Sequence, residues 1–403
     1  MPELFIAADD FTGALDTGVK LARQGVSVRV TDGAEAMECR ETVLVSNLET
    51  RHVSRDHAFH ITLDACVRAL KAGASCIYIK TDSGLRGNIG AALEAAARAV
   101  GGRVVFAPAY PALNRISVNG IHMIGDLPVS QSVFGKDPLN PVKHDSIYEI
   151  LAEQTDLRVL SGRDGAPCEK EYIELRELNT DGEMLAYALE TRRSAAQAKA
   201  YAGCAGFAEV LGELLSLTVN RRHAAKIRLP LAVISASLSQ INFEQMRFGE
   251  ALGLKSCALR DVFASEPDYA KIVAETLASS KGALIESAKS RTEAEELSEK
   301  GEKEGLDAAA RALIISKNMG GAASALVQAG FKGTLCLFGG DVLKRALQSL
   351  SCRALVPIDE VEPGVVVSRA ITDRGEITVV SKSGSFGSPE VIQKLIDYAE
   401  VNK

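Results

Sequence analysis

The sequence predicts an α/β protein made of two α/β domains with mostly parallel sheets and a ligand cleft between them. Short apolar runs alternate with helical patterns along nearly all of its 403 residues, and this alternation is typical of βαβ units. The length suffices for two or three domains of roughly 100–200 residues each. Hydrophobic residues make up 46% and charged residues 24%, so a sizeable core can form.

The first domain, residues 1–225, contains four apolar runs that we expect to be buried strands. These are LFIAA at 4–8, ETVLVSN at 41–47, SCIYIK at 75–80 and VVFAPA at 104–109. RISVNGIHMIG at 115–125 predicts a hairpin, because its apolar positions alternate and Asn119-Gly120 favours a type I′ turn. Ser146 and Glu149 form a candidate capping box for the helix that begins SIYEIL.

The second domain, residues 230–403, repeats the alternation after a predicted hinge near 222–230. Its expected strands are LAVISA at 231–236, GALIES at 282–287, TLCLFGG at 334–340 and EITVVSK at 376–382. The charged stretch RTEAEELSEKGEKEGL predicts a solvated helix capped by Thr292 and Glu295. Ser388-Pro389 matches the N-cap and first position of a last helix.

Charge and cysteine content restrict the classes of partner. The net charge of −6 argues against a surface that neutralises a nucleic-acid backbone. The eight cysteines form no C-x-x-C pair and no zinc-like spacing, which indicates a reducing cytosol and no metal site. The start has no signal-peptide pattern, and no apolar run approaches 18 residues. We therefore expect a cytoplasmic protein that binds neither nucleic acid nor membrane.

The stretch AADDFTGA at 7–14 places two adjacent carboxylates, Asp9 and Asp10, between a strand and a helix. Ligands of open α/β sheets bind at such carboxyl ends of strands. N-capping is the simpler interpretation, but it explains one aspartate better than two. Two carboxylates would repel a phosphate, so the loop suits hydroxyl groups or a cation.

The third strand ends in KTDSGLRGN at 80–88, which contains neither of the familiar phosphate-loop patterns. Its cations, Lys80 and Arg86, suit a carboxylate or phosphate, while Asp82 and Ser83 suit hydroxyl groups. Arg51 follows the second expected strand and could hold a carboxylate with two parallel hydrogen bonds. A solvated turn could contain the same residues; otherwise these positions predict a pocket for a small hydroxylated acid.

Three strand–helix junctions of the second domain are rich in glycine and serine. Such junctions expose backbone N–H groups that hold phosphates, although each alone is a common turn. Together they predict a nucleotide site. The residues concerned are Ser235, Ser237 and Ser239, then Gly339, Gly340 and Asp341, and finally Lys382, Ser383 and Gly384.

In order along the chain, these motifs resemble those of the four-carbon acid sugar kinases. The resemblance covers ADDFTGALDTG, KTDSGLRGN, RISVNGIHMIGDLPV, FGKDPLNPV, YAGCAGFAEVL, SASLSQINFEQ, FGGDVLKRAL, EVEPGVVVS and SKSGSFG. It implies an amino-terminal domain for the acid and a carboxy-terminal domain for ATP. It also implies substrate contacts from Asp10, Arg51, Lys80, Thr81, Asp82 and Ser83, and nucleotide contacts from Ser237, Gly339, Gly340, Asp341, Val342 and Gly384. The chain has Val342 where the family usually has Thr, and Ala236 where it tends to have Gly.

The resemblance implies transfer of the γ-phosphate of ATP to the terminal hydroxyl of threonate, erythronate or a 2-oxo-tetronate. Mg²⁺ would bridge the phosphates, and Lys382 or Arg86 would neutralise developing charge. Asp10 or Asp82 would accept the hydroxyl proton, with Asp10 preferred. The alternative is a non-catalytic sugar-acid binding or regulatory protein, which Val342 would favour. We also expect a homodimer.

Overall fold

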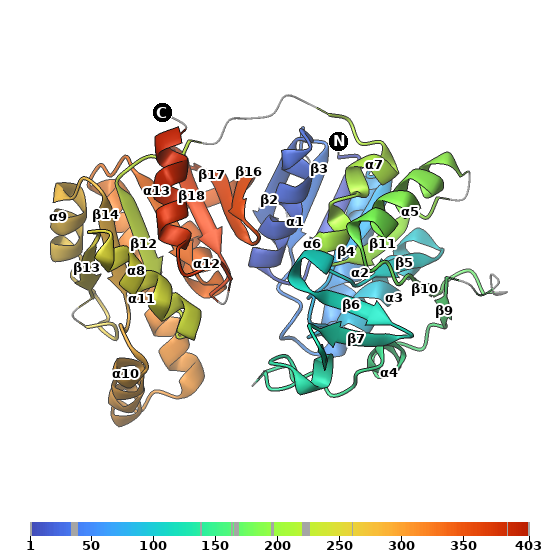
Figure 1. Cartoon of the computed structure of the whole chain (residues 1–403), viewed down its shortest axis with the longest axis horizontal. Coiled ribbons are helices and arrows are strands. Elements are labelled where there is room, and N and C mark those ends of the chain that lie inside the picture. Colours follow the sequence, from blue (N-terminus) through green and yellow to red (C-terminus); the bar gives the residue numbers. More distant parts are fainter. Residues whose placement is uncertain are drawn as a thin grey trace. The chain divides into compact units, whose positions relative to one another are not determined.

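The computed structural model describes residues 2–33, 39–137, 139–162, 164, 169–194, 197–219, 226–259, 261–384 and 386–401. The chain divides into two compact units, residues 1–222 and 223–403, and each is an α/β fold (Figure 1). The α/β class and the largely parallel sheets are confirmed. The first part of the expected hinge, residues 222–225, lies outside the described residues.

The sheet of the first unit has eight strands, and every neighbouring pair is parallel. Their order is β2-β3-β1-β4-β11-β5-β10-β9. All residues of β1, β3 and β4 are buried, as expected for a parallel sheet with both faces covered. The strands are β1 (Leu4–Ala8), β2 (Val28–Asp32), β3 (Val43–Asn47), β4 (Cys76–Lys80), β5 (Val104–Ala107), β9 (Val159–Ser161), β10 (Ile173–Leu175) and β11 (Ala200–Gly203).

Helices follow most of these strands, and their small apolar residues allow close packing. In α3, eight of the first nine residues are buried, five of them alanine. Ile89, Leu93 and three of the alanines join side chains of the sheet and of α2 in one core. The helices are α1 (Phe11–Arg23), α2 (Arg55–Lys71), α3 (Ile89–Val100), α4 (Ile147–Ala152), α5 (Asp181–Arg193), α6 (Ala205–Ala208) and α7 (Leu211–Leu215).

Strand β1 lies between β3 and β4. The chain runs from β1 outward to β2, returns through β3, and then crosses to β4 on the other side of β1. Ala8 is level with Asn47 of β3 and with Lys80 of β4. The loops after these three strands therefore emerge side by side. This is a topological switch point, where ligands of open α/β sheets bind.

The expected hairpin is confirmed. Strands β6 (Arg115–Val118) and β7 (Ile121–Ile124) pair antiparallel, and β8 (Leu127–Pro128) extends them to a small second sheet. Asn119 and Gly120 both have positive φ, 52° and 78°, as a type I′ turn requires. Ser146 caps α4 by accepting a hydrogen bond from the backbone N–H of Glu149, which is one half of the expected capping box; the Glu149 carboxylate lies beside His144 instead.

The second unit has a seven-stranded mixed sheet in the order β13-β14-β12-β15-β18-β17-β16. The first five strands of this order are parallel, whereas β17 pairs antiparallel with β18 and β16. All four expected runs are strands; β13, β16 and β17 were not expected. The strands are β12 (Leu231–Ser235), β13 (Lys255–Ala258), β14 (Gly282–Glu286), β15 (Thr334–Phe338), β16 (Cys352–Glu362), β17 (Val365–Thr372) and β18 (Gly375–Lys382).

Two predicted helix starts in the second unit are wrong. Helix α10 is capped by Ser290, which accepts from the N–H of Glu293, two positions before the expected Thr292 and Glu295. The last helix begins at Val391, and the Ser388 hydroxyl donates to Glu362 instead of capping it. The helices are α8 (Gln240–Ala251), α9 (Ala270–Ala278), α10 (Arg291–Lys303), α11 (Ala308–Gln328), α12 (Gly340–Ser349) and α13 (Val391–Val401).

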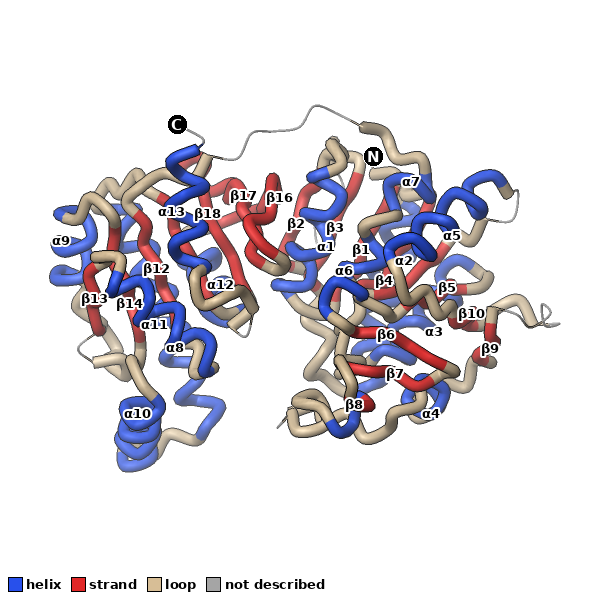
Figure 2. The backbone as a smooth tube through the Cα atoms, in the orientation of Figure 1, coloured by secondary structure: helices blue, strands red, loops and turns tan. Residues whose placement is uncertain are grey.

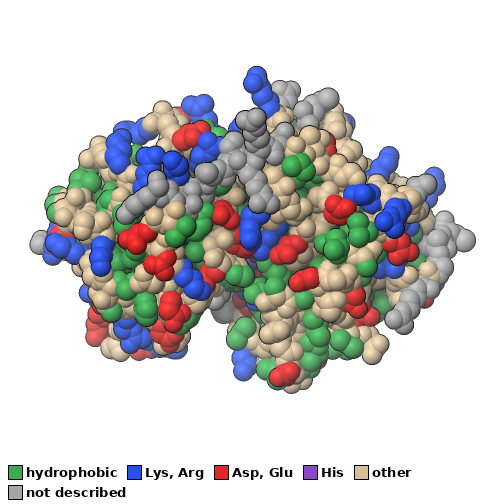
Figure 3. Space-filling model, turned by 45° about the horizontal axis from the view of Figure 1, so that its top comes forward, with side chains coloured by type: hydrophobic (Ala, Val, Ile, Leu, Met, Phe, Trp, Pro, Cys, Tyr) green, Lys and Arg blue, Asp and Glu red, His purple; other side chains and the backbone are tan. Residues whose placement is uncertain are grey.

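The distribution of elements and charges is visible in two further views. Figure 2 shows strands and helices alternating within each unit. On the face drawn in Figure 3, basic and acidic side chains are interspersed. Within the described residues, every helix is too short or too polar to cross a membrane.

Candidate functional site

Charged side chains gather at the carboxyl ends of β1, β3 and β4. Asp9 and Asp10 follow β1, Arg51 follows β3, and Lys80 ends β4 with Asp82 two residues on. The structure therefore brings these residues together, because the parallel register places the three strand ends level with one another. Arg51, Lys80 and Asp82 are buried, and buried charges need close partners.

Arg51 is the centre of this cluster. Its Nε donates to Oδ2 of Asp9 at 2.7 Å, and its Nη2 lies 2.9 Å from Oδ1 of Asp10. The same Nη2 is 3.7 Å from Oδ1 of Asp82. Burial opposes the charge of Arg51, yet the three carboxylates raise its pKa well above the ordinary value. Arg51 therefore holds the aspartates of two different loops together.

Asp10 is both the N-cap of α1 and a member of the charged cluster. Its Oδ1 accepts from the N–H of Gly13 at 3.0 Å, and its Oδ2 accepts from the Thr12 hydroxyl at 2.8 Å. Burial would raise its pKa, but Arg51 and Lys80 outweigh burial and lower it. The side chain of Asp10 is 26% exposed, against 9% for Asp82, so Asp10 is the more accessible carboxylate.

Asp9 has a different environment from its neighbour. Burial is the largest influence on it and raises its pKa, although Arg51 and Lys80 act in the opposite direction. The Lys80 ammonium donates to the carbonyl of Thr81 at 2.7 Å and lies 3.9 Å from Oδ1 of Asp9. The two adjacent aspartates therefore differ in role: Asp10 faces outward from the cap, and Asp9 faces the protein interior.

The loop after β4 is closed by a second arginine. Asp82 accepts from Nε and Nη2 of Arg86, both at 2.9 Å, and from the N–H of Gly84. Burial would raise the pKa of Asp82, but Arg51 and Arg86 lower it strongly. Arg86 also donates to Asp137 at 2.8 Å. Because most acceptor positions of Asp82 are occupied, it is less suited than Asp10 to receive a proton.

The hairpin region supplies a residue that sequence reasoning missed, Arg115, and a histidine, His122, for which a structural role is the simpler interpretation of the sequence. Arg115 donates to the hydroxyl of Ser83, and its guanidinium and that of Arg86 each lie 4.9 Å from the centre of the Phe134 ring. Nε2 of the fully buried His122 donates to the carbonyl of Ser83, 2.9 Å away. The hairpin prediction located these residues along the chain, but only the fold shows that they hold the loop after β4.

In the second unit, a cavity of about 360 Å³ lies beside the strand–helix junctions. Five of the residues expected to contact the nucleotide lie in its wall: Ser237, Gly339, Gly340, Asp341 and Val342. A second part of the wall was not expected from the sequence and is largely apolar. It comes from α10, α11 and the loop before α9, and includes Phe263, Ala294, Leu297, Ala308, Ala312 and Ile315.

Lys382 and Gly384 join this wall through hydrogen bonds. The N–H of Gly339 donates to the carbonyl of Lys382 at 2.8 Å, and the Ser239 hydroxyl donates to the carbonyl of Gly384 at 2.6 Å. A Cβ on Gly384 would lie 2.4 Å from Oγ of Ser237, so this close approach requires glycine. The three expected junctions therefore form one surface.

The Lys382 ammonium is buried beside this surface. It donates to the carbonyls of Ser383 and Gly384 at 3.1 and 3.3 Å and lies 4.6 Å from the centre of the Phe338 ring. Burial lowers its pKa to about 7, and the negative charge of Glu362 only partly opposes this. A phosphate brought close to Lys382 would restore its charge.

Among the described residues, no group of three or more His, Cys, Asp or Glu side chains is placed to hold a metal ion. Oxygen donors do line the cavity of the second unit, and they include the Asp341 carboxylate and the Ser237 hydroxyl. Few protein ligands plus phosphate oxygens are what Mg²⁺ uses at nucleotide sites, so this donor set fits Mg²⁺ bound together with a nucleotide.

Comparisons with known proteins agree with this division of the chain. Residues 4–211 match the family model of a sugar-binding N-terminal domain. Residues 232–392 match the model of a nucleotide-binding C-terminal domain. The charged cluster lies in the first matched region and the 360 Å³ cavity in the second.

Relatives match over nearly the whole length. A D-threonate kinase of Salmonella typhimurium is 27% identical, over 99% of this chain and 98% of the relative. A 3-oxo-tetronate kinase of Burkholderia multivorans is 25% identical, over 98% and 97%. A solved structure from Salmonella typhimurium LT2 shares the fold with a TM-score of 0.79, at 20% identity over 98% of each chain.

Proposed function

Because this chain belongs to the four-carbon acid sugar kinase family, we propose that it phosphorylates the terminal hydroxyl of a four-carbon sugar acid. The acid is threonate, erythronate or a 2-oxo-tetronate, the phosphate donor is ATP, and the product is the 4-phosphate. The observation that carries the proposal is the buried cluster of alternating carboxylates and cations at the carboxyl ends of β1, β3 and β4.

The acid binds in the first domain, residues 1–225. Asp10, Asp82 and Ser83 hydrogen-bond its hydroxyl groups, and Thr81 lies in the same loop. The positive charges of Arg51, Lys80 and Arg86 compensate the carboxylate of the substrate. Arg51 is already bonded to Asp9 and Asp10, so it contributes mainly by its charge and by fixing these two carboxylates.

The nucleotide binds in the second domain, residues 230–403. Backbone N–H groups of the first turn of α12, from Gly340 onward, face the phosphates, and Gly339 forms the turn that leads into this helix. Ser237, Asp341, Val342 and Gly384 complete the phosphate end, and the apolar wall from α10 and α11 receives the base. Val342 is only 2% exposed, so its lack of a hydroxyl leaves the backbone donors intact.

Transfer proceeds by positioning and charge neutralisation, as in other phosphoryl transfers. The hydroxyl oxygen of the acid forms the new bond to the γ-phosphorus, the bond from that phosphorus to the bridging oxygen of ADP breaks, and the hydroxyl proton passes to Asp10. Lys382 and Arg86 neutralise charge on the phosphoryl group. Asp341 and Ser237 would hold Mg²⁺, which would supply further neutralisation of the phosphates.

The two ligands must meet for the reaction to occur. We therefore propose that the two domains close around the acid and ATP. Direct transfer needs the acceptor oxygen within about 3–3.5 Å of the γ-phosphorus. Closure also excludes water, which would otherwise hydrolyse ATP.

An ADP-release assay tests the proposal. The panel contains the stereoisomers of threonate and erythronate and their oxo derivatives, with glycerate and a five-carbon acid as controls. We expect one four-carbon acid to exceed both controls in kcat/KM by at least about tenfold, since one carbon more or less is worth roughly 10–200-fold. Equal rates with the controls would contradict the proposal. Binding of the acid without ATP turnover would identify a binding protein instead.

A further inference from the structure

A further cation, Arg115, lies at the same edge of the sheet as the charged cluster. The strand register places Lys80, Gly203 and Ala107, the last residues of β4, β11 and β5, level with one another. A few residues after β5, the backbone N–H of Tyr110 donates to the carbonyl of Arg115 at 2.7 Å, and the N–H of Arg115 donates to the carbonyl of Tyr110 at 3.1 Å. Arg115 therefore begins β6 at the edge of the sheet that holds the cluster.

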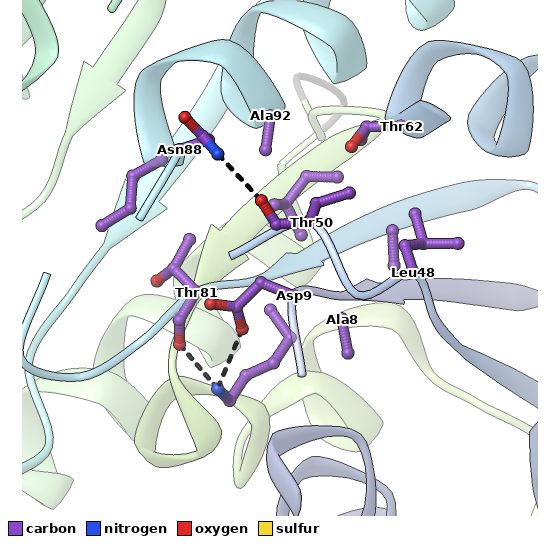
Figure 4. A pocket seen from close by; sticks show the side chains of 12 residues that line it. Ala8, Asp9, Leu48, Thr50, Thr62, Thr81, Asn88 and Ala92 are labelled. Atoms are coloured by element: carbon purple, nitrogen blue, oxygen red, sulfur yellow. Dashed lines mark hydrogen bonds and ion pairs between the residues drawn. The ribbon is translucent and has the colours of Figure 1, made fainter. Parts of the chain in front are cut away.

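The cations of the cluster itself already compensate carboxylates of the protein. Nε, Nη1 and Nη2 of Arg51 lie 2.7, 3.1 and 2.9 Å from oxygens of Asp9 and Asp10. The same three nitrogens of Arg86 bond two further carboxylates at 2.8 and 2.9 Å. The Lys80 ammonium faces Asp9 and donates to a neighbouring backbone carbonyl (Figure 4). A substrate carboxylate would have to compete with these bonds.

Arg115 has a different environment, in which two of its contacts are with uncharged groups. Its Nη1 donates to the hydroxyl of Ser83, and its guanidinium lies 4.9 Å from the centre of the Phe134 ring. Burial lowers the pKa of Arg115, and the negative charge of Asp82 only partly opposes this. An anion bound to Arg115 would stabilise its charge.

We infer that Arg115 binds the carboxylate of the sugar acid directly. This inference deepens the proposed function and rests on it. The planar guanidinium matches a carboxylate with two parallel hydrogen bonds. Because the Ser83 hydroxyl accepts from Arg115, its own proton is directed to another acceptor, and the same carboxylate provides one.

The order of the strands then gives the acid a direction. Asp10 follows β1, on one side of β4, whereas the chain reaches Arg115 from β5, which lies on the other side beyond β11. The acid therefore lies across the end of β4, with its terminal hydroxyl toward Asp10 and its carboxylate toward Arg115. This is the orientation that transfer to the terminal hydroxyl needs.

Comparison of each acid with an uncharged analogue tests the inference. Threitol and erythritol have a hydroxymethyl group in place of the carboxylate of threonate and erythronate. Calorimetry without ATP gives the Kd of each. In Arg115→Met we expect the Kd of the bound acid to rise about 10–100-fold, as for loss of a hydrogen bond to a charged group, and the Kd of the polyol to stay nearly unchanged. Arg115→Lys keeps the charge without the planar fork and should lie between.

Arg98→Met is the matched control for loss of a cation stacked on an aromatic ring. Arg98 lies 5.8 Å from the centre of the Phe59 ring and bonds Glu94. It belongs to the last turn of α3, whereas the charged cluster lies near the first turn of that helix. Arg98→Met should leave the Kd of the acid unchanged.

The outcomes separate this inference from the proposed function. Equal losses of acid and polyol binding in Arg115→Met would mean a distorted hairpin and would overturn the inference, as would an unchanged Kd for the acid. If the wild type bound none of the four-carbon acids, the proposed function itself would fail.

Nuclear magnetic resonance of protein with ¹⁵N-labelled arginine tests the contact without the polyol. The Nε–H signal of Arg115 is identified by its absence in Arg115→Lys. We expect saturating acid to shift this signal and to leave that of Arg98 in place. No shift of the Arg115 signal under saturating acid overturns the inference.

Discussion

At the residue scale, Asp10 caps helix α1 and is also the proposed acceptor of the substrate's hydroxyl proton. One oxygen caps α1 through the N–H of Gly13, and the other receives hydrogen bonds from Thr12 and Arg51. The cap fixes the direction of the carboxylate, and Arg51 keeps it ionised by lowering its pKa. The cap is therefore compatible with the proposed role of Asp10 as proton acceptor.

Asp10→Asn separates the two functions, because asparagine caps helices about as well as aspartate but accepts no proton from the substrate. We expect kcat to fall about 10²–10⁴-fold with a change in Tm of no more than a few degrees. Asp10→Ala is the matched control that loses both functions, and it should lose about 1 kcal/mol of stability as well. A kcat for Asp10→Asn equal to the wild type would exclude Asp10 as the proton acceptor.

Lys382 should gain a proton when ATP binds. Burial holds its pKa at about 7, so at about pH 8.5 the free protein carries it mostly as a neutral amine. Nearby phosphates favour the ammonium form and raise the pKa, so binding takes up close to one proton. Calorimetry in buffers of different ionisation enthalpy measures this uptake, and Lys382→Met should abolish it. A binding enthalpy independent of buffer in the wild type would contradict the prediction.

At the scale of the elements, the sequence predicted buried strands better than exposed or irregular ones. Runs such as LFIAA and VLVSN are continuous and apolar because β1 and β3 are buried on both faces. Strand β13, by contrast, reads Lys-Ser-Cys-Ala and lies at the edge of its sheet. Its pairing with β14 decides its conformation, and no local pattern reveals that.

The prediction of helix starts failed for a related reason. Ser388 is a good capping residue in isolation, but the nearby Glu362 accepts its hydroxyl and its N–H. Glu362 ends β16, which is distant in sequence. Local rules identify candidates for a cap, whereas tertiary partners decide which candidate is used.

The first turn of α1 depends on Gly13. A Cβ at this position would lie 2.3 Å from Oδ1 of Asp10 and 2.6 Å from Nζ of Lys80. Gly13→Ala should therefore displace the charged cluster, destabilise the first domain by about 1–3 kcal/mol and raise KM for the acid. In Gly182→Ala, near the start of α5, the new Cβ has 3.9 Å to its nearest neighbour, so this control should be neutral or up to about 1 kcal/mol more stable. Denaturant unfolding measures both, and equal effects of the two substitutions would contradict the packing argument.

At the scale of the whole molecule, the sequence located both candidate sites along the chain but not their complete walls. The charged cluster was predictable, because its members follow strands whose carboxyl ends are level in a parallel sheet. The apolar wall beside Gly339 was not, because residues such as Leu297 and Ile315 have ordinary helical spacing. Arg115 and His122 belong to a hairpin, and only tertiary structure brings them to Ser83.

The proposed acid site and the proposed nucleotide site lie in different units, and this leads to a prediction about how each ligand changes the stability. The acid should stabilise the first unit and ATP the second, each by about 2.7 kcal/mol when present at 100 times its Kd, or about 5–10 °C in Tm. Lys382→Met should lose most of the ATP shift and keep the acid shift. Asp82→Asn should do the reverse, because it releases Arg86 and the loop after β4. Differential scanning calorimetry with each ligand alone distinguishes the four combinations. If either substitution removed both shifts, the ligands would share one site, and the assignment of acid and nucleotide to different domains would be wrong.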